Sequence, residues 1–369
     1  MADKISQSDL DNPEELQLLY AQVHPYFKVY EVAYDNSSVY FYGTPRVDVS
    51  ILQKSLWPVF ASKGYQMQLT SNMGEDVLVA TPVVQDDGKF PLTNVILAIL
   101  TIFTTMLAGA SMFGADVFSG PSAILEGLPF TIAIMAVLGS HEMGHYFMAK
   151  RRGMKTTLPY FIPFPSIIGT MGAVIKHKGP IPDRKSLFDV AVAGPLVGLF
   201  VSIIVTFVGL TLPAVEFSPE PGSLVIDLQL PLLFELLGWM VGYNGEMLHP
   251  VAFAGWVGMF ITLLNLLPTG QLDGGHAMRA MLGERAKHIS SSMPIVLALV
   301  ALYVAYVMKA NASVWIFWSI FLLFFAAAGH PTPLDDLSKL DSRRMAVGVV
   351  TFILGALCFT LVPFSLVTV

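Results

Sequence analysis

Apolar runs about 20 residues long dominate the sequence from residue 90 onward. Seven of them have the length and composition of membrane-spanning helices, at about 92–113, 128–149, 187–212, 251–268, 292–309, 313–329 and 345–367. Residues 1–89 differ, because they mix charges with short periodic segments. The pattern predicts a polytopic α-helical membrane protein with about seven transmembrane helices over residues 90–369, preceded by a small α+β soluble domain.

Within residues 1–89 the pattern predicts helices and strands in alternation. Asn12 and Pro13 begin a helix that runs to about Val23. A hairpin at 29–34 and 38–42, a helix at 47–62 and strands at 65–70 and 76–84 follow from the spacing of apolar and β-branched residues. Nothing in this domain has recognisable catalytic chemistry.

Composition narrows the class of protein further. Hydrophobic residues make up 54% of the 369 residues and charged residues only 13%, whereas soluble domains carry about 25% charged residues. The net charge of −6 does not favour binding to nucleic acid. Cys358 is the single cysteine, so histidine and carboxylate side chains must hold any metal. The acidic N-terminus has no apolar core, which predicts neither a signal nor a transit peptide.

Basic residues predict the orientation in the membrane. The predicted loops 114–127 and 213–249 contain no lysine or arginine. With residues 1–89 in the cytoplasm, the inner side receives Lys150, Arg151, Arg152, Lys155, Lys176, Lys178, Arg184, Lys185, Arg279, Arg285, Lys287, Lys339, Arg343 and Arg344. Lys309 is the one basic residue on the outer side. We therefore expect a cytoplasmic N-terminus and an external C-terminus.

Two segments between the spans are not ordinary loops. Residues 230–243 are apolar but too short to cross a bilayer, which predicts a re-entrant or interfacial helix on the outer side. In residues 158–182, three prolines prevent a helix, and the apolar run from Gly169 to Ile175 predicts a strand on the cytoplasmic side.

The second span contains the candidate chemistry. His141 and His145 are four residues apart, so a helix directs both imidazoles from one face, within reach of one Zn²⁺. Glu142 beside them can take a proton from a water whose pKa the ion lowers towards about 7. Ionisable side chains inside a bilayer cost several kcal/mol unless they are paired or used, so chance is the weaker explanation.

A catalytic zinc needs a third protein ligand. Asp273 is the candidate, because Pro268 ends the fourth span and Gly270, Gly274 and Gly275 let the backbone fold back inward. The direction of the spans brings Asp273 and the histidines towards the same cytoplasmic end. The sequence leaves open whether His276 competes as a ligand or supports the site from behind.

His141-Glu142-x-x-His145 in one span and Asn265-x-x-Pro268-x-x-x-Leu272-Asp273-Gly274 at the end of another resemble the site-2 protease family of intramembrane zinc metalloproteases. The likeness covers about residues 128–280, and the segment from Phe188 to Pro195 is also similar to this family. The soluble N-terminal domain without a PDZ-like insertion resembles an archaeal, cyanobacterial and chloroplast branch.

The resemblance implies a catalytic core at about 128–280 that binds one Zn²⁺ through His141, His145 and Asp273. It implies Glu142 as the base and a role for Asn265 in holding the oxyanion. The family places Gly169 to Gly172 near the substrate strand, and the apolar run Gly172, Ala173, Val174 and Ile175 offers an edge to which an unwound substrate can add. The expected activity is hydrolysis of a peptide bond within or near the transmembrane helix of a single-span membrane protein, in a prokaryotic plasma membrane.

Three other functions fit parts of the sequence. An ion or proton-coupled transporter also uses intramembrane His, Glu and Asp, but no internal repeat is detectable and the ionisable residues cluster at one depth. A zinc-binding pseudoprotease would have no need of Glu142. A multispan CAAX-type protease shares the His-Glu-x-x-His motif, but its third ligand would be a glutamate, which the Leu272-Asp273-Gly274 context does not match.

Overall fold

The computed structural model describes residues 19–35, 38–72, 75–82, 91–178, 181–213, 224–245, 247–327, 329, 333, 336 and 338–368. The chain divides into two compact units. One unit holds the residues up to Phe90 with the short segments 179–183 and 333–338, and the second unit holds the remainder.

The first unit contains an antiparallel sheet and a helix. Its elements are β1 (Phe27–Asp35), β2 (Ser38–Pro45), α2 (Val49–Ser62), β3 (Tyr65–Asn72) and β4 (Glu75–Pro82). The sheet has the strand order β1-β2-β4-β3. Leu52, Leu56 and Phe60 of α2 are buried with Phe41 and Leu78 of the sheet, which makes a core of its own. The predicted hairpin, helix and strands are confirmed; residues 12–18 of the first predicted helix lie outside the described residues.

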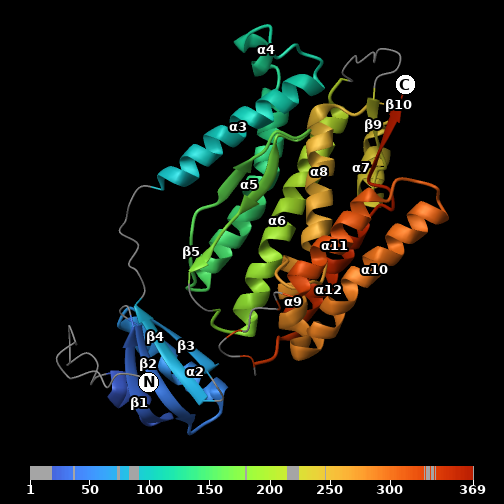
Figure 1. Ribbon diagram of the computed structural model, residues 1–369. Helices are drawn as coiled ribbons and strands as arrows, with labels where there is room; N and C mark the ends of the chain where they lie inside the picture. The colour runs from blue at the N-terminus through green and yellow to red at the C-terminus, as the bar shows by residue number, and fades with distance from the viewer. Residues whose placement is uncertain are drawn as a thin grey trace. The chain divides into compact units, whose positions relative to one another are not determined.

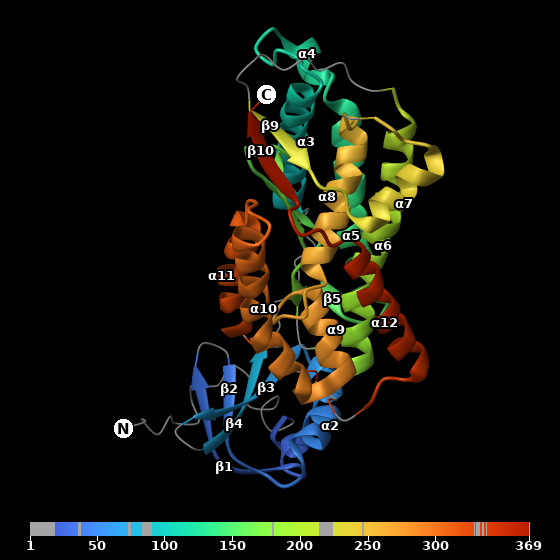
Figure 2. The same ribbon diagram turned by 90° about the vertical axis from the view of Figure 1, so that its right-hand side faces the viewer.

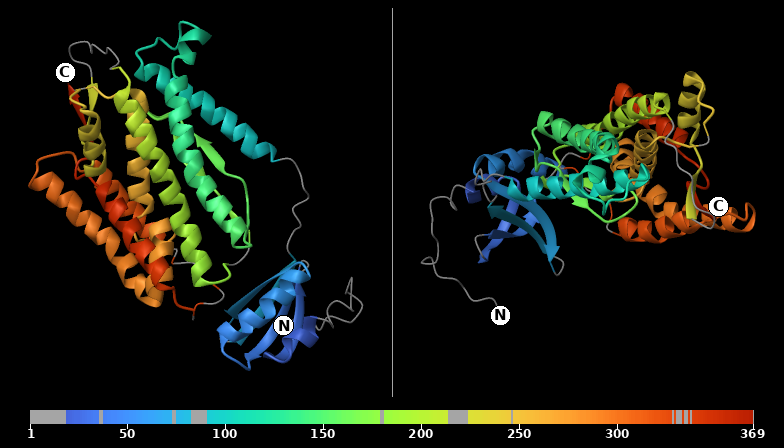
Figure 3. Two further views of the ribbon diagram at one scale, coloured as in Figure 1. Left: turned by 180° about the vertical axis from the view of Figure 1, so that it is seen from behind. Right: turned by 90° about the horizontal axis from the view of Figure 1, so that it is seen from above.

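The second unit is mostly helical. Its helices are α3 (Leu92–Met112), α4 (Pro121–Leu125), α5 (Leu128–Arg151), α6 (Arg184–Thr211), α7 (Leu232–Val241), α8 (Pro250–Asn265), α9 (Asp273–Leu282), η1 (Gly283–Arg285), α10 (Ala286–Tyr306), α11 (Ser313–Ala327) and α12 (Ser342–Leu357). Helix α6 packs between α5 and α8, and α10 packs along α11 (Figures 1 and 2). The view from behind shows α5 and α6 side by side over most of their length (Figure 3).

Within the described part of the chain, three helical stretches are long and apolar enough to cross a membrane. They are Leu92–Met112, Arg184–Thr211 and the continuous stretch Asp273–Tyr306. Leu232–Val241, Pro250–Asn265 and Ser313–Ala327 are apolar but shorter. Helix α5 has sufficient length, but its histidines and Glu142 lower its hydropathy.

The last predicted span, 345–367, is wrong at its C-terminal end. Helix α12 ends at Leu357, and Phe364–Thr368 forms β10, which pairs antiparallel with β9 (Leu224–Leu228). Pro363 cannot continue a helix, and the alternation that follows it suits a strand. Strand β9 was not predicted either. The two strands lie at the same end of this unit as α4 (Figures 1 and 2).

The segment after α5 forms two small antiparallel pairs. Strand β5 (Lys155–Thr156) pairs with β8 (His177–Lys178), and β6 (Tyr160–Pro163) pairs with β7 (Thr170–Val174). Strand β7 confirms the predicted strand. The prolines of residues 158–182 exclude only a helix, so no pattern in the sequence predicts β6. The helix α7 agrees with the short apolar helix predicted within 230–243.

Helix α3 holds the β6–β7 hairpin. The Asn94 side chain donates hydrogen bonds of 2.9 Å to the carbonyl oxygens of Leu158 and Pro159. At the hairpin turn, Gly169 has a φ of +74°, and a Cβ there would lie 2.4 Å from the Thr104 carbonyl oxygen of α3. A side chain at this position would therefore be both strained and crowded. The hairpin also contacts α5, the helix that carries the His-Glu motif.

Candidate metal centre

Two turns of α5 present the histidine pair to the interior of the bundle. The side chains of His141 and His145 leave one face of the helix because they are four residues apart. Both residues are buried, with 4% and 6% of their surface exposed. Their Nε2 atoms lie 3.2 Å apart.

A folded-back loop delivers Asp273 to the histidines. Helix α8 ends at Asn265, and the chain turns before α9 begins at Asp273 itself. A Cβ on Gly274 would lie 2.1 Å from the Leu266 carbonyl oxygen, so this turn closes only with glycine. The N–H of Gly270 donates a 2.8 Å hydrogen bond to Oγ of Ser290 on α10, which ties the loop to its neighbour.

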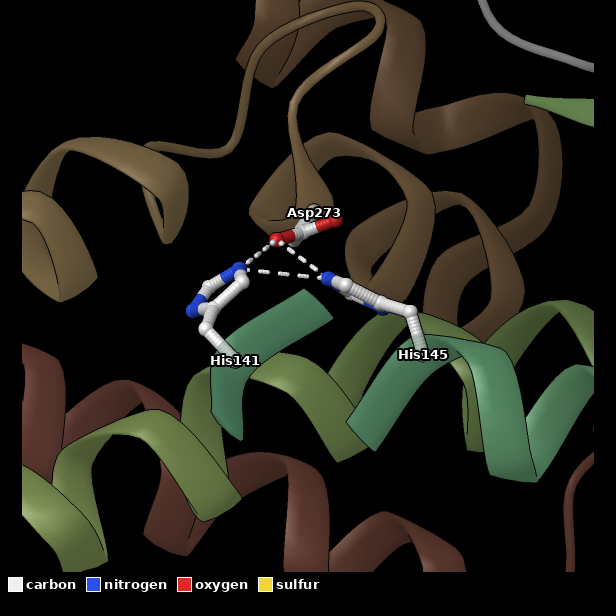
Figure 4. A group of neighbouring side chains, drawn as sticks. All are labelled: His141, His145 and Asp273. Atoms are coloured by element: carbon white, nitrogen blue, oxygen red, sulfur yellow. Dashed lines mark hydrogen bonds and ion pairs between the residues drawn. The ribbon is translucent and has the colours of Figure 1, made fainter. Parts of the chain in front are cut away.

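The Asp273 carboxylate completes a three-sided group. Its Oδ2 atom lies 3.2 Å from Nε2 of His145 and 3.3 Å from Nε2 of His141 (Figure 4). Among the described residues, His141, His145 and Asp273 are the set of closely spaced His, Cys, Asp and Glu side chains that could hold a metal. His276, on the next turn of α9, does not belong to this set.

These separations fit zinc. Two ligand atoms at about 2.0–2.1 Å from a tetrahedral Zn²⁺ lie about 3.3 Å from one another. Nδ1 of His145 lies 2.8 Å from the Val190 carbonyl oxygen, which can only accept, so Nδ1 carries the proton. In the neutral imidazole Nε2 of His145 then directs a lone pair at the other two ligand atoms, and a cation between them removes the repulsion. Three protein ligands leave the fourth position open, as catalytic zinc sites require.

Helix α6 lies so close to the histidines that the positions of α6 that contact them must be glycine. A Cβ on Gly194 would lie 2.1 Å from Nε2 of His145, and a Cβ on Gly198 would lie 2.9 Å from Cβ of His141. On α5, Gly144 faces the Ala193 carbonyl oxygen in the same way. This contact brings Val190 within reach of His145 and fixes the orientation of its ring.

Glu142 and Asn265 lie beside the metal group without being part of it. Glu142 is 8% exposed, and the backbone N–H of Ile175, directly after β7, lies close enough to interact with its carboxylate. Nδ2 of Asn265 lies 3.3 Å from Nε2 of His141. The structure thus brings the candidate base, the candidate oxyanion donor and the end of the predicted substrate strand to one place.

Sequence reasoning missed the residues that support this group. Arg184, at the start of α6, is buried and donates hydrogen bonds of 2.9 and 2.6 Å to the Ala280 carbonyl oxygen. These bonds cap the C-terminal end of α9, the helix that begins with Asp273. In the sequence Arg184 only counts as one more basic residue of an inner loop, so it carried no signal of this contact.

Comparison with known proteins supports the family predicted from the motifs. Residues 129–308 match the model of peptidase family M50. The probable zinc metalloprotease EGY2, chloroplastic, of Arabidopsis thaliana is 27% identical over 324 residues, which are 82% of this chain and 55% of that protein. The probable zinc metalloprotease EGY1, chloroplastic, of the same organism is 31% identical over 250 residues, which are 64% of this chain and 43% of that protein.

A solved structure is similar as well. The site-2 protease from Methanocaldococcus jannaschii aligns with 18% identity and a TM-score of 0.32, over 65% of this chain and 91% of that chain. The chain spans about half the length of the curated relatives it matches. The matched region contains both motifs and every residue of the metal group. Over residues 129–308 the chain is therefore similar to peptidase family M50.

Proposed function

We propose that this protein is an intramembrane zinc metalloprotease that hydrolyses a peptide bond within or near the transmembrane helix of a single-span membrane protein. The observation that carries the proposal is the buried triangle of His141, His145 and Asp273, with ligand atoms 3.2–3.3 Å apart and Glu142 beside it. The relatives whose names describe zinc metalloproteases support the same activity.

In the proposed mechanism each residue has a separate task. His141, His145 and Asp273 hold the zinc, which when bound supplies a Lewis acid that polarises the scissile carbonyl and lowers the pKa of water. Glu142 takes the proton from the attacking water and later gives it to the leaving amine. Asn265 donates a hydrogen bond to the carbonyl oxygen as that oxygen gains negative charge.

Replacing Glu142 by Gln tests the reaction. The Glu142→Gln variant keeps the shape of the side chain but cannot accept the proton. We expect zinc content to stay at one ion per chain while cleavage of a single-span substrate in detergent falls about 10²–10⁴-fold. Cleavage at the normal rate by a zinc-loaded variant would remove Glu142 from the role of base. In contrast, Asp273→Ala should lower the zinc content itself.

Strand addition is the proposed way in which a helical substrate reaches the metal. A peptide bond in a helix is hydrogen-bonded and sterically covered, so the substrate must unwind and find new backbone partners inside the membrane. Strand β7 lies between β6 and α5, and Ile175 at its end contacts Glu142. A substrate segment paired with β7 would pass beside the base in extended form.

The seven-span arrangement is part of the proposal. Helices α3, α5, α6, α8, α10, α11 and α12 fall at the seven predicted positions. Strand β9 follows the third of these helices and β10 follows the seventh, and the two strands pair. Four crossings lie between them, and an even number of crossings returns the chain to the same side. The pairing therefore supports a position of both strands on one side of the membrane, which is the external side in the proposed topology.

The orientation can be tested by labelling. We propose that residues 1–89 face the cytoplasm of a prokaryotic plasma membrane and that the C-terminus lies outside, because lysine and arginine concentrate on one side. The native Cys358 is buried. A single cysteine in place of the exposed Ser119 should react with an impermeant reagent added outside, and one in place of the exposed Lys155 should not. The opposite result would invert the proposed topology.

A further inference from the structure

One carboxylate joins three helices close to the metal centre. Asp189 on α6 accepts hydrogen bonds from Arg344 of α12, at 2.7 Å from Nε and 2.9 Å from Nη2. Asp189 also forms an ion pair with Arg152, the residue that follows the last turn of α5. The Asp189 side chain is 13% exposed. One partly buried negative charge thus faces two guanidinium groups from two other helices.

This cluster adjoins the contact that orients a metal ligand. The residue after Asp189 is Val190, whose carbonyl oxygen accepts the 2.8 Å hydrogen bond from Nδ1 of His145. Arg152, directly after α5, lies seven residues beyond His145, which is about two helical turns. The same two helices are therefore joined twice, once by Asp189 and Arg152 and once by Val190 and His145. A shift of α6 along α5 would break both contacts together.

We infer that Asp189 is a positioning residue for His145, and that it makes the affinity for zinc depend on the attachment of α12. Its ion pair with Arg152 holds α6 in the register that keeps Val190 on Nδ1 of His145. Its bidentate bonds to Arg344 tie the first turn of α12 to the same point. Without the carboxylate, two cations face each other at partly buried positions, and their repulsion separates the helix ends.

Asp189→Asn tests this inference, because asparagine keeps the size of the side chain and removes the charge. The measurements are the zinc dissociation constant of the purified full chain, by competition with a chelator, and the visible absorption spectrum after Co²⁺ replaces zinc. We expect an affinity about tenfold or more weaker, in the range found when groups behind a metal ligand are changed. We also expect a changed Co²⁺ spectrum, which a loss of stability alone would not produce.

Asp341→Asn is the matched control. Asp341 also pairs with Arg344, but its side chain is 41% exposed and it does not contact α6 through this pair. We expect Asp341→Asn to bind zinc as the parent chain does. Arg344→Gln should weaken zinc binding less than Asp189→Asn, because the link from Asp189 to Arg152 remains.

A double variant covers the case in which Asp189→Asn does not fold. Arg152→Gln with Asp189→Asn removes one of the two cations that face position 189 and still lacks the α5–α6 ion pair. A folded double variant with weakened zinc binding and a changed Co²⁺ spectrum supports the inference. Parent-like affinity and spectrum in either Asp189 variant would overturn it, as would equal weakening by Asp341→Asn.

Discussion

The metal centre and the β6–β7 hairpin lie against the same helix, α5, but they are built in opposite ways. The metal centre is buried, and α6 lies against its two histidines at Gly194 and Gly198, at distances that leave no room for a Cβ. The hairpin is exposed, with Met171 at 66% and Val174 at 45%.

The different uses of glycine show what each region requires. Gly194 has no room for a Cβ, because the His145 ring occupies that position. Gly172 has a φ of +100° and open space around it, so its glycine serves backbone conformation instead. A catalytic group must be held within a fraction of an ångström, whereas a strand that receives a substrate must leave one edge unpaired. Rigidity is therefore concentrated where the chemistry occurs.

Gly194→Ala should have the largest effect of the variants that separate these two regions. The added methyl group would lie 2.1 Å from Nε2 of His145, so either the ring or α6 must move. We expect loss of stoichiometric zinc and loss of all cleavage, measured by metal analysis and by a substrate assay. Gly139→Ala is the control on α5, because its Cβ would meet only the Phe161 ring at 3.8 Å. Normal zinc content in Gly194→Ala would contradict the view that close packing maintains the ligand geometry.

This difference also explains what could be predicted from the sequence. The sequence alone predicts the four residues of the candidate site, His141, Glu142, His145 and Asp273. Ionisable residues are costly in apolar runs, and the spacing of these residues is that of a zinc site. The helices follow from the length of the apolar runs. The contacts that support these residues depend on which helices meet and in which register. Examples are the bonds of Arg184 to the end of α9 and of His145 to the Val190 carbonyl oxygen. Periodicity carries no information about that register.

The missed strands have a related cause. Strands β6 and β9 are four and five residues long, and each pairs with a partner that no local turn signal identifies. The residues of β10 are apolar and continue an apolar run, which predicts a helix in place of the strand. Pro363 marks the true boundary, because proline cannot continue the helix.

Proline in strand β7 should affect the hairpin region while leaving the metal centre intact. Neighbouring residues of a strand direct their N–H groups to opposite sides. The N–H of Ile175 points to Glu142, so Ala173, two residues earlier, directs its N–H to the same side and away from β6. We expect Ala173→Pro to reduce cleavage of a transmembrane substrate sharply, because it deletes a donor at the proposed substrate edge, with normal zinc content.

Val174→Pro is the comparison for this test. Val174 pairs with Tyr160. By the same alternation we expect its N–H to face β6, so proline there should loosen the hairpin and increase hydrogen exchange at the amides of β6. Ala173→Pro should leave that exchange near its normal rate. If Ala173→Pro cleaves at the parent rate, or loses zinc, substrate addition to β7 is not supported.

Asn94→Ala should have the smallest effect of the three, and it tests how the hairpin keeps its place beside α5. The variant removes two 2.9 Å hydrogen bonds and leaves the carbonyl groups of Leu158 and Pro159 without this donor. A loss of this kind costs about 1–3 kcal/mol, and a cost of about 1.4 kcal/mol would decrease cleavage about tenfold if the hairpin must be in place for reaction. Zinc content should not change, because no ligand or supporting backbone group of the metal centre contacts Asn94 through these bonds.

Thr101→Val is the matched control on α3, since among the described residues the Thr101 hydroxyl donates to the Leu97 carbonyl oxygen of its own helix, at 2.8 Å. Asn94→Ala should increase hydrogen exchange in β6 and β7, whereas Thr101→Val should not. Equal losses of cleavage in the two variants would mean that α3 acts through its own stability and not through its hold on the hairpin.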